Sequence, residues 1–259
     1  MSTSDGEVTL SLDGRVATLT LRRPGKLNAL TPEMLRALAG HLVTLADSDT
    51  GVVVVRGEGP KAFSVGADID RFAALTPVQM LGWTGLGHQV FDALSRLRQP
   101  TVAVIHAPAY GGGLELALAC DLRIVTASAR LGLPEVGLGT VPGWGGTGRL
   151  TELVGRARAK EVVLARRTLD GATAEAWGLA AACVPAADLE RAVDDLVTRL
   201  LGGAPVAVAL AKQLIDAAAD GAPARVLESL AGAVTTATDD LQAGLTGFRT
   251  RTTPRFSGR

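Results

Sequence analysis

Three consecutive glycines, Gly111-Gly112-Gly113, follow an apolar run from Val102 to Ile105 and precede an alanine-rich helical pattern. Glycine lets a backbone approach a ligand closely, with its N–H groups turned outward. A second apolar run covers Leu122 to Val125, and Pro134-Glu135 then leads into Gly143-Trp144-Gly145-Gly146. This stretch therefore predicts a site for an anion, or for an oxyanion that forms during a reaction, beside buried strands.

Two glutamates in this stretch are candidates for acid–base chemistry. Glu115 falls in the first turn of the helix opened by Gly113, where the helix dipole favours an ionised carboxylate. It could serve only helix stability, but its neighbours are apolar on all sides, and a buried carboxylate needs a partner or a purpose. Glu135, after Pro134, could be an exposed loop residue. Because one strand pattern separates them, the two glutamates could face one pocket and divide proton donation and removal between them.

Composition limits the partners of the chain. Its 259 residues include 26 Lys and Arg against 26 Asp and Glu, so no net field favours nucleic acid or a membrane surface. No apolar run approaches the roughly 20 residues of a membrane-spanning helix, and the N-terminus lacks the pattern of a signal peptide. The two cysteines, Cys120 and Cys183, form neither a disulfide framework nor a metal-site spacing. We expect a cytoplasmic protein with a small-molecule partner.

The order of elements predicts the fold class. Alternating apolar residues on both sides of Asp13-Gly14 predict a β-hairpin, and Thr31-Pro32 predicts a helix start. Strands are expected at Val52 to Val55 and at Lys61 to Val65. A hairpin or strand pair followed by a helix is then expected to recur around Leu86 to Leu97, Val102 to Cys120 and Leu122 to Val154. The pattern predicts an α/β fold of stacked strand-strand-helix turns rather than a doubly wound nucleotide fold.

The strand signal fades from about Gly155, and helices are expected over most of the remaining chain. The expected helices cover Arg156 to Leu164, Thr173 to Trp177, Asp188 to Leu201, Pro205 to Ala219, Ala224 to Thr236 and Asp239 to Phe248. The tail after Leu241 holds arginines and no acid. It could be a solvated terminus or could contact a phosphate.

Other chemistries lack support in the sequence. No Gly-x-Ser-x-Gly elbow, metal-ligand spacing or N-terminal Gly-x-Gly-x-x-Gly after a strand is present. Gly66-Ala67-Asp68 would present one more backbone N–H, that of Ala67, at a strand end. Asp68 and Asp70 themselves are expected to cap a helix.

Several motifs together resemble the enoyl-CoA hydratase/isomerase (crotonase) superfamily, in order along nearly the whole chain. They are Arg23-Pro24 with Asn28-Ala29-Leu30, Lys61 to Ile69, Gly111 to Ala117 with Cys120-Asp121, Pro134-Glu135, and Gly139 to Thr147. The resemblance implies a crotonase-like spiral core at residues 1–198, carrying the acyl-CoA site, and a C-terminal helical oligomerisation region at residues 199–259. It implies a homotrimer or a dimer of trimers.

The resemblance also implies roles for residues. The N–H groups of Ala67 and Gly112 would form an oxyanion hole for the thioester oxygen, and Glu115 and Glu135 would be the catalytic carboxylates. Arg251 would contact a CoA phosphate. The remaining residues expected to bind substrate are Lys26, Leu27, Lys61, Ala62, Gly66, Asp68, Ile69, Asp70, Gly113, Pro134 and Gly143.

Because family hydratases carry both glutamates, the resemblance favours hydration of trans-2-enoyl-CoA to 3-hydroxyacyl-CoA, with no metal and no cofactor beyond the CoA of the substrate. Double-bond isomerisation within the same fold and a non-catalytic acyl-CoA-binding role are the alternatives. Ala107, Pro108, Tyr110 and Trp144 depart from the usual pattern near the expected acyl pocket. Because of these departures, the sequence does not specify which acyl group the substrate carries.

Overall fold

The predicted N-terminal hairpin begins the main sheet. In the computed structural model, which describes residues 6–259, β1 (Glu7–Asp13) pairs antiparallel with β2 (Val16–Arg22). The sheet continues with parallel strands in the order β1-β2-β3-β4-β6-β9. These later strands are β3 (Val52–Gly57), β4 (Thr101–Ile105), β6 (Leu122–Thr126) and β9 (Ala182–Val184). Parallel neighbours require crossover connections, which bring the helices onto the sheet faces.

A second, smaller sheet has the order β5-β7-β8. Its strands are β5 (Ala109–Tyr110), β7 (Arg130–Gly132) and β8 (Leu169–Asp170). The chain therefore leaves β4 for β5 and leaves β6 for β7, adding one strand to each sheet before the next helix. These repeated steps confirm the predicted stack of strand-strand-helix turns.

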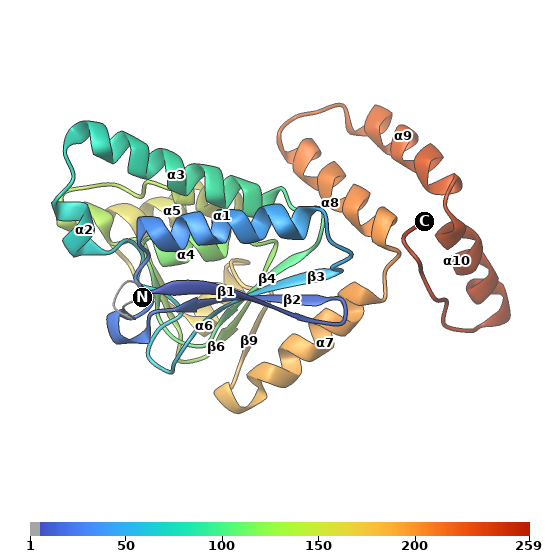
Figure 1. The fold of residues 1–259 in the computed structure, drawn as a ribbon, viewed down its shortest axis with the longest axis horizontal. Helices are drawn as coiled ribbons and strands as arrows, with labels where there is room; N and C mark the ends of the chain where they lie inside the picture. The colour runs from blue at the N-terminus through green and yellow to red at the C-terminus, as the bar shows by residue number, and fades with distance from the viewer. Residues whose placement is uncertain (1–5) are drawn as a thin grey trace.

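Helices cover both faces of the main sheet (Figure 1). The larger apolar core lies between one face and α1 (Pro32–Ala46), α3 (Pro77–Ser95), α4 (Gly112–Leu118), α5 (Gly146–Leu164) and α6 (Gly171–Ala176). On the other face, Val52 and Val54 pack with α7 (Leu189–Leu201). Since both faces of β3 are buried, its sequence is a continuous run of valines rather than an alternation.

Helix starts follow the predicted caps. The Thr31 side chain accepts a hydrogen bond from the Met34 N–H, with Pro32 opening α1. Asp68 caps α2 (Ile69–Ala73) by accepting from the N–H groups of Asp70 and Arg71, as expected. Short 3-10 turns are η1 (Pro24–Lys26), η2 (Glu135–Leu138) and η3 (Ala186–Asp188).

Some predicted elements are wrong or displaced. Residues 61–65 form no strand; Ser64 alone makes a parallel bridge, to Ala109, and the Asn28 side chain holds the segment by donating to the Ala62 carbonyl at 3.0 Å. The unit predicted around Leu86 to Leu97 is instead the end of α3, which begins at Pro77, where Thr76 and Gln79 form a capping box. Strands also persist beyond Gly155, as β8 and β9, but their two or three residues are too short to show a period.

The C-terminal helices form an arm that extends from the core (Figure 1). They are α8 (Pro205–Ala219), α9 (Ala224–Thr236) and α10 (Asp239–Thr250), and α8 and α9 bury none of their residues within this chain. The predicted boundary between residues 198 and 199 falls within α7 and stays a prediction. In the described part of the chain no single helix is long and apolar enough to cross a membrane; Ala186–Leu201 with Pro205–Ala219 meet that test only as a pair, bent by 102°.

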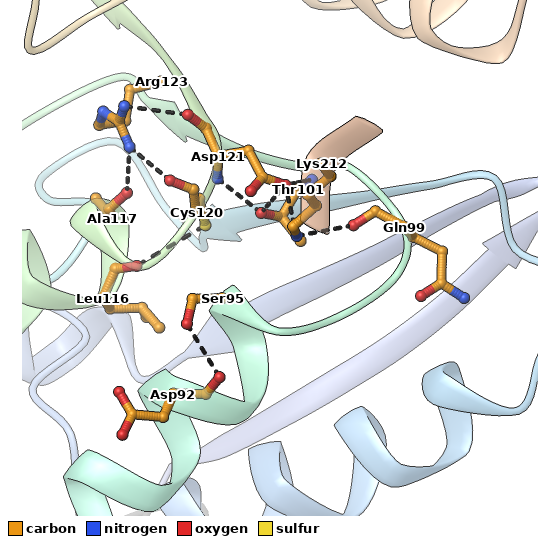
Figure 2. Close-up of polar contacts among 10 residues, drawn as sticks. All are labelled: Asp92, Ser95, Gln99, Thr101, Leu116, Ala117, Cys120, Asp121, Arg123 and Lys212. Atoms are coloured by element: carbon orange, nitrogen blue, oxygen red, sulfur yellow. Dashed lines mark hydrogen bonds and ion pairs between the residues drawn. The ribbon is translucent and has the colours of Figure 1, made fainter. Parts of the chain in front are cut away.

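A polar network joins the arm to the core (Figure 2). Oδ2 of Asp121, between α4 and β6, accepts the N–H and the hydroxyl of Thr101 at 2.7 and 2.9 Å. Lys212 of α8 donates to the same oxygen at 2.9 Å, and its side chain is only 9% exposed. Nearby, the buried Arg123 guanidinium donates to the carbonyls of Ala117, Cys120, Asp121 and Leu179. Asp121 is therefore the anion that compensates a nearly buried ammonium group.

We expect Asp121→Ala to lower the free energy of unfolding by about 3 kcal/mol, because Lys212 would remain buried without its counter-ion. Urea denaturation at fixed protein concentration measures this loss. Glu7→Ala, which removes an exposed ion pair with Arg22 at 3.4 Å, is the control and should cost less than about 1 kcal/mol. Equal losses in the two variants would contradict the assignment.

Candidate active site

The segment that carries Ala67 is fixed by Leu30 on one side. The Leu30 N–H donates to the Gly66 carbonyl at 2.7 Å, and the Asp68 N–H donates to the Leu30 carbonyl at 2.9 Å. In this parallel bridge the residues before and after Ala67 make the bonds, so the Ala67 N–H points away from Leu30. Ala67 itself is half-buried.

Gly112 presents a second N–H at the start of α4. As the first residue of the helix, it has no carbonyl one turn earlier to accept its hydrogen. Gly66 lies directly against it, because a side-chain carbon at Gly66 would be 2.6 Å from the Gly112 nitrogen. A side-chain carbon at Gly113 would likewise lie 2.2 Å from the Ser64 carbonyl oxygen. The two backbone segments thus touch with no side chain between them.

Across residues 6–259, neither the Ala67 nor the Gly112 N–H donates to a protein acceptor. Buried amides normally have partners, so two neighbouring donors without one are suited to an oxygen supplied by a ligand. The geometry is that of a pair of donors for one oxyanion.

Glu115 lies beside these donors and is 2% exposed. Its Oε1 accepts the N–H of Trp144 at 2.8 Å and the N–H of Gly146 at 2.9 Å. Burial raises the pKa of Glu115, while the amides of the glycine-rich loop oppose that rise by stabilising the charged form. Both of these bonds end on Oε1, and the Gly143 amide also favours the charged carboxylate.

The Trp144 side chain packs between two glycines. A side-chain carbon at Gly87 or at Gly112 would lie 2.1 or 2.2 Å from the indole, so only glycine fits at either position. The indole makes edge contacts with Trp83, at a ring separation of 5.2 Å, and with Phe91, at 5.4 Å. Trp144 therefore borders both the Gly112 donor and, through its own N–H, Glu115.

Glu135 differs from Glu115 in its surroundings. Within the described residues, both of its carboxyl oxygens are buried and neither has a hydrogen-bond partner. A side-chain carbon at Gly111 would be 3.2 Å from its Oε1, which places the carboxyl beside the residue preceding Gly112. Burial, with the nearby Glu115 charge as a further cause, raises the pKa of Glu135 to about 7. The two glutamates thus share one site, with Glu135 suited to hold a proton near neutral pH.

The other predicted residues fall into three places. Leu27, Lys61 and Ala62 line a pocket of about 220 Å³ together with Asn28 and Glu58. Lys26, Ile69 and Asp70 are exposed near it, and Lys26 pairs with Asp70 at 3.3 Å. Gly66, Gly113, Pro134 and Gly143 surround the donors and the carboxylates.

Two predicted residues do not face this site in the same chain. Asp68 is buried in an ion pair with Arg23 at 2.5 Å; although burial opposes its ionisation, Arg23 and the amides it caps bring its pKa below the usual value. It thereby fixes the turn after Ala67. Arg251 ends α10 on the arm, exposed and away from the core (Figure 1).

Sequence reasoning missed the groups that hold Glu115. Gly143 was expected to bind substrate, but the N–H groups of Trp144 and Gly146 as carboxylate donors were not predicted. The sequence signal for these donors is Gly145-Gly146 at the start of the α5 helix, because the first N–H groups of a helix lack partners within the helix and can bind a carboxylate. The acceptor, Glu115, lies 29 residues before Trp144, and no sequence motif with that spacing marks the contact.

Known proteins resemble this chain over nearly its whole length. The family model Enoyl-CoA hydratase/isomerase matches residues 12–259. The short-chain-enoyl-CoA hydratase of Clostridium acetobutylicum is 35% identical over 93% of this chain and 94% of its own, and the crotonyl-CoA hydratase of Syntrophomonas wolfei is 33% identical over 93% and 94%. A crystal structure of enoyl-CoA hydratase from Bacillus anthracis superposes with a TM-score of 0.94 at 32% identity, covering 97% of this chain and 99% of that one. The predicted fold class is confirmed.

The raised pKa of Glu135 predicts a pH-dependent cost to stability. Below pH 4.5, the ordinary value, Glu135 is protonated in both the folded and the unfolded chain. Between pH 4.5 and about 7 the unfolded chain releases this proton first, so the wild type loses stability as pH rises, and above that range the loss is complete. Glu135→Gln lacks this loss. It should be more stable than wild type by roughly 2 kcal/mol at pH 8, less than the whole shift gives because the site is partly open to solvent.

Urea denaturation at pH 4 and pH 8 measures this difference, which should disappear at the lower pH. Glu152→Gln, at an exposed glutamate of α5, is the matched control. A Glu135→Gln variant that gains nothing at pH 8 would show that the carboxyl is not destabilised by its surroundings.

Proposed function

Because this chain belongs to the enoyl-CoA hydratase/isomerase family, we propose that it is an enoyl-CoA hydratase, which adds water across the 2,3 double bond of a trans-2-enoyl-CoA to give the 3-hydroxyacyl-CoA. The observation that carries the proposal is the pair of glutamates in unequal surroundings beside two unpartnered backbone donors. An isomerase needs only one carboxylate to shuttle a proton, whereas addition of water uses both a base and an acid.

The N–H groups of Ala67 and Gly112 would bind the thioester oxygen. As water attacks, negative charge moves onto this oxygen, and donors already fixed in place stabilise it without reorganising. Each such donor contributes typically about 3 kcal/mol to the transition state. The close contact of Gly66 with Gly112 is what directs both donors at one oxygen.

The carboxylates divide the proton transfers. Glu115, whose charge is stabilised by two amides, would accept the proton of the attacking water through Oε2 as the water oxygen bonds to C3. Glu135, with no donors on its oxygens and a pKa of about 7, would arrive protonated and give its proton to C2. One proton is removed and one is supplied, so water is added overall and no cofactor beyond the CoA of the substrate is needed.

The pocket beside η1 would hold part of the CoA moiety. Leu27, Asn28, Lys61 and Ala62 line it, and the exposed Lys26 near its rim offers positive charge. Arg251 follows α10 of the arm, which extends from the core (Figure 1), so its contact with a CoA phosphate would be made with a neighbouring copy.

We expect Glu115→Ala and Glu135→Ala each to lower kcat for crotonyl-CoA by at least about 100-fold, because each removes one of the two proton transfers. The loss of enoyl-thioester absorbance measures hydration, and circular dichroism checks folding. Glu152→Ala, on the surface of α5, should keep full activity. Full hydration by either active-site variant would reject the two-carboxylate mechanism, and movement of a 3-enoyl double bond without addition of water would indicate isomerisation instead.

The arm supports a homotrimer or a dimer of trimers. Large apolar side chains lie exposed along it in the single chain, namely Ile215, Val226, Leu230, Val234, Leu245 and Phe248. This many exposed apolar side chains on three helices favour burial against a partner, and the neutral charge balance of the chain does not oppose self-association. The unpaired Cys120 and Cys183 are consistent with a cytoplasmic location, which cell fractionation would test.

Sedimentation equilibrium should give the mass of three or six chains. Leu230→Asp combined with Val234→Asp should lower that mass, because two charges would enter the buried interface. Leu12→Asp, at an exposed leucine of β1, is the control and should leave the mass unchanged. A wild-type monomer would contradict the proposed assembly.

A further inference from the structure

The loop that holds Glu115 is itself held from outside by a guanidinium group. Arg149, in the first turns of α5, donates through Nη1 to the Trp144 carbonyl at 2.9 Å. Its Nη2 forms an ion pair with Oδ1 of Asp92, on α3, at 2.5 Å. The Arg149 side chain is 17% exposed. One side chain thus joins α3, α5 and the loop before α5.

The backbone of the loop is shaped around this guanidinium. Gly145 has a φ of +92°, and a side-chain carbon there would lie 2.4 Å from Arg149 Nη1. The positive φ turns the chain so that the Trp144 carbonyl faces Arg149 while the N–H groups of Trp144 and Gly146 face Glu115. The loop is therefore fixed between a cation on one side and a carboxylate on the other.

We propose that the Asp92–Arg149 ion pair is a positioning device for Glu115, acting through the Trp144 carbonyl to keep two amide donors on Oε1. Asp92 holds the guanidinium in one orientation, and the guanidinium holds the loop. The fixed donors keep the carboxylate ionised and leave Oε2 directed at the water. The catalytic consequence rests on the proposed hydratase function, since it requires Glu115 to be the base.

Several charged or titratable groups surround α4 besides this pair. His88 of α3 favours the ionised form of Glu115, whereas the Glu135 and Glu115 charges oppose each other. Besides the Asp92–Arg149 pair, α3 carries His88, η2 carries Glu135, and β5, which packs on α4, carries Tyr110. Arg149 differs from the rest in bonding directly to the loop that supplies the amides.

Arg149→Met and Asp92→Asn test the proposal. Outer residues that orient an active-site group typically change activity by about 10–100-fold, so kcat for crotonyl-CoA should fall by about that factor in Arg149→Met and by less in Asp92→Asn. KM should change less than about two-fold, because neither side chain lines the CoA pocket. The acidic limb of the kcat/KM profile should move to higher pH, since Glu115 would lose amides that favour its charged form. The kcat of Arg149→Lys should lie between those of Arg149→Met and wild type. The lysine ammonium group keeps the positive charge, but it cannot bond to the Trp144 carbonyl and to Asp92 as effectively as the two guanidinium nitrogens do.

The control is Arg167→Met, which removes an ion pair of the same 2.5 Å length with Glu161 and a contact of Arg167 with the Trp177 ring at 4.8 Å. Neither contact includes a residue of the loop. This variant should leave the pH profile and kcat unchanged. A folded Arg149→Met protein whose kcat and pH profile equal those of Arg167→Met would overturn the proposal.

A second readout does not depend on activity. Infrared titration of protein labelled with carbon-13 in the glutamate carboxyls follows protonation directly, and Glu115→Gln identifies the Glu115 band. That band should remain protonated to higher pH in Arg149→Met than in wild type. An unchanged titration in Arg149→Met would overturn the positioning role whether or not the wild type adds water. A shifted band in Arg149→Met, together with a wild type that never hydrates crotonyl-CoA, would overturn only the proposed function.

Discussion

The contact between two stretches of backbone, around Gly66 and around Gly112, is the constraint on which the site depends. A side-chain carbon at Gly66 would lie 2.6 Å from the Gly112 nitrogen, so the approach is possible only because both positions lack one. Two isolated parallel bridges flank this contact. Ser64, just before Gly66, pairs with Ala109, just before the glycines, and Ala67 pairs with Leu30. The fold therefore uses two isolated bridges and a glycine contact to bring the Ala67 and Gly112 amides close together.

The site also depends on the different surroundings of its two carboxyl groups. The carboxyl oxygens of Glu135 are buried without a hydrogen-bond partner among the described residues, whereas Oε1 of the buried Glu115 accepts two loop amides. In a low-dielectric site, that difference in donors decides which carboxyl holds the proton. In the proposed reaction the same residue type would serve as base or acid according to the backbone around it, and the loop before α5 supplies amides to Glu115.

Much of this arrangement could be predicted from the sequence, and the features that could not be predicted depend on contacts between residues far apart in the chain. The hairpin, the cap at Thr31 and the position of Glu115 in the first turn of a buried helix follow local rules, and all appear in the structure. The strand expected at 61–65 does not form because Asn28, far earlier in the chain, holds that segment through side-chain bonds to the carbonyls of Glu58 and Ala62. The Asp92–Arg149–Trp144 contacts join residues 57 and 5 positions apart, and no local period or spacing marks the first of these.

The main chain and the side chain of Trp144 have separate contacts in this site. Its main-chain N–H holds Glu115, a role that any residue except proline could fill, whereas its indole fills the space between Gly87 and Gly112. A smaller side chain at this position would keep the donor and open apolar volume beside the oxyanion amides. The loop can therefore keep its polar contacts, through the backbone and Arg149, while the side chain at residue 144 sets how much room remains for the acyl group.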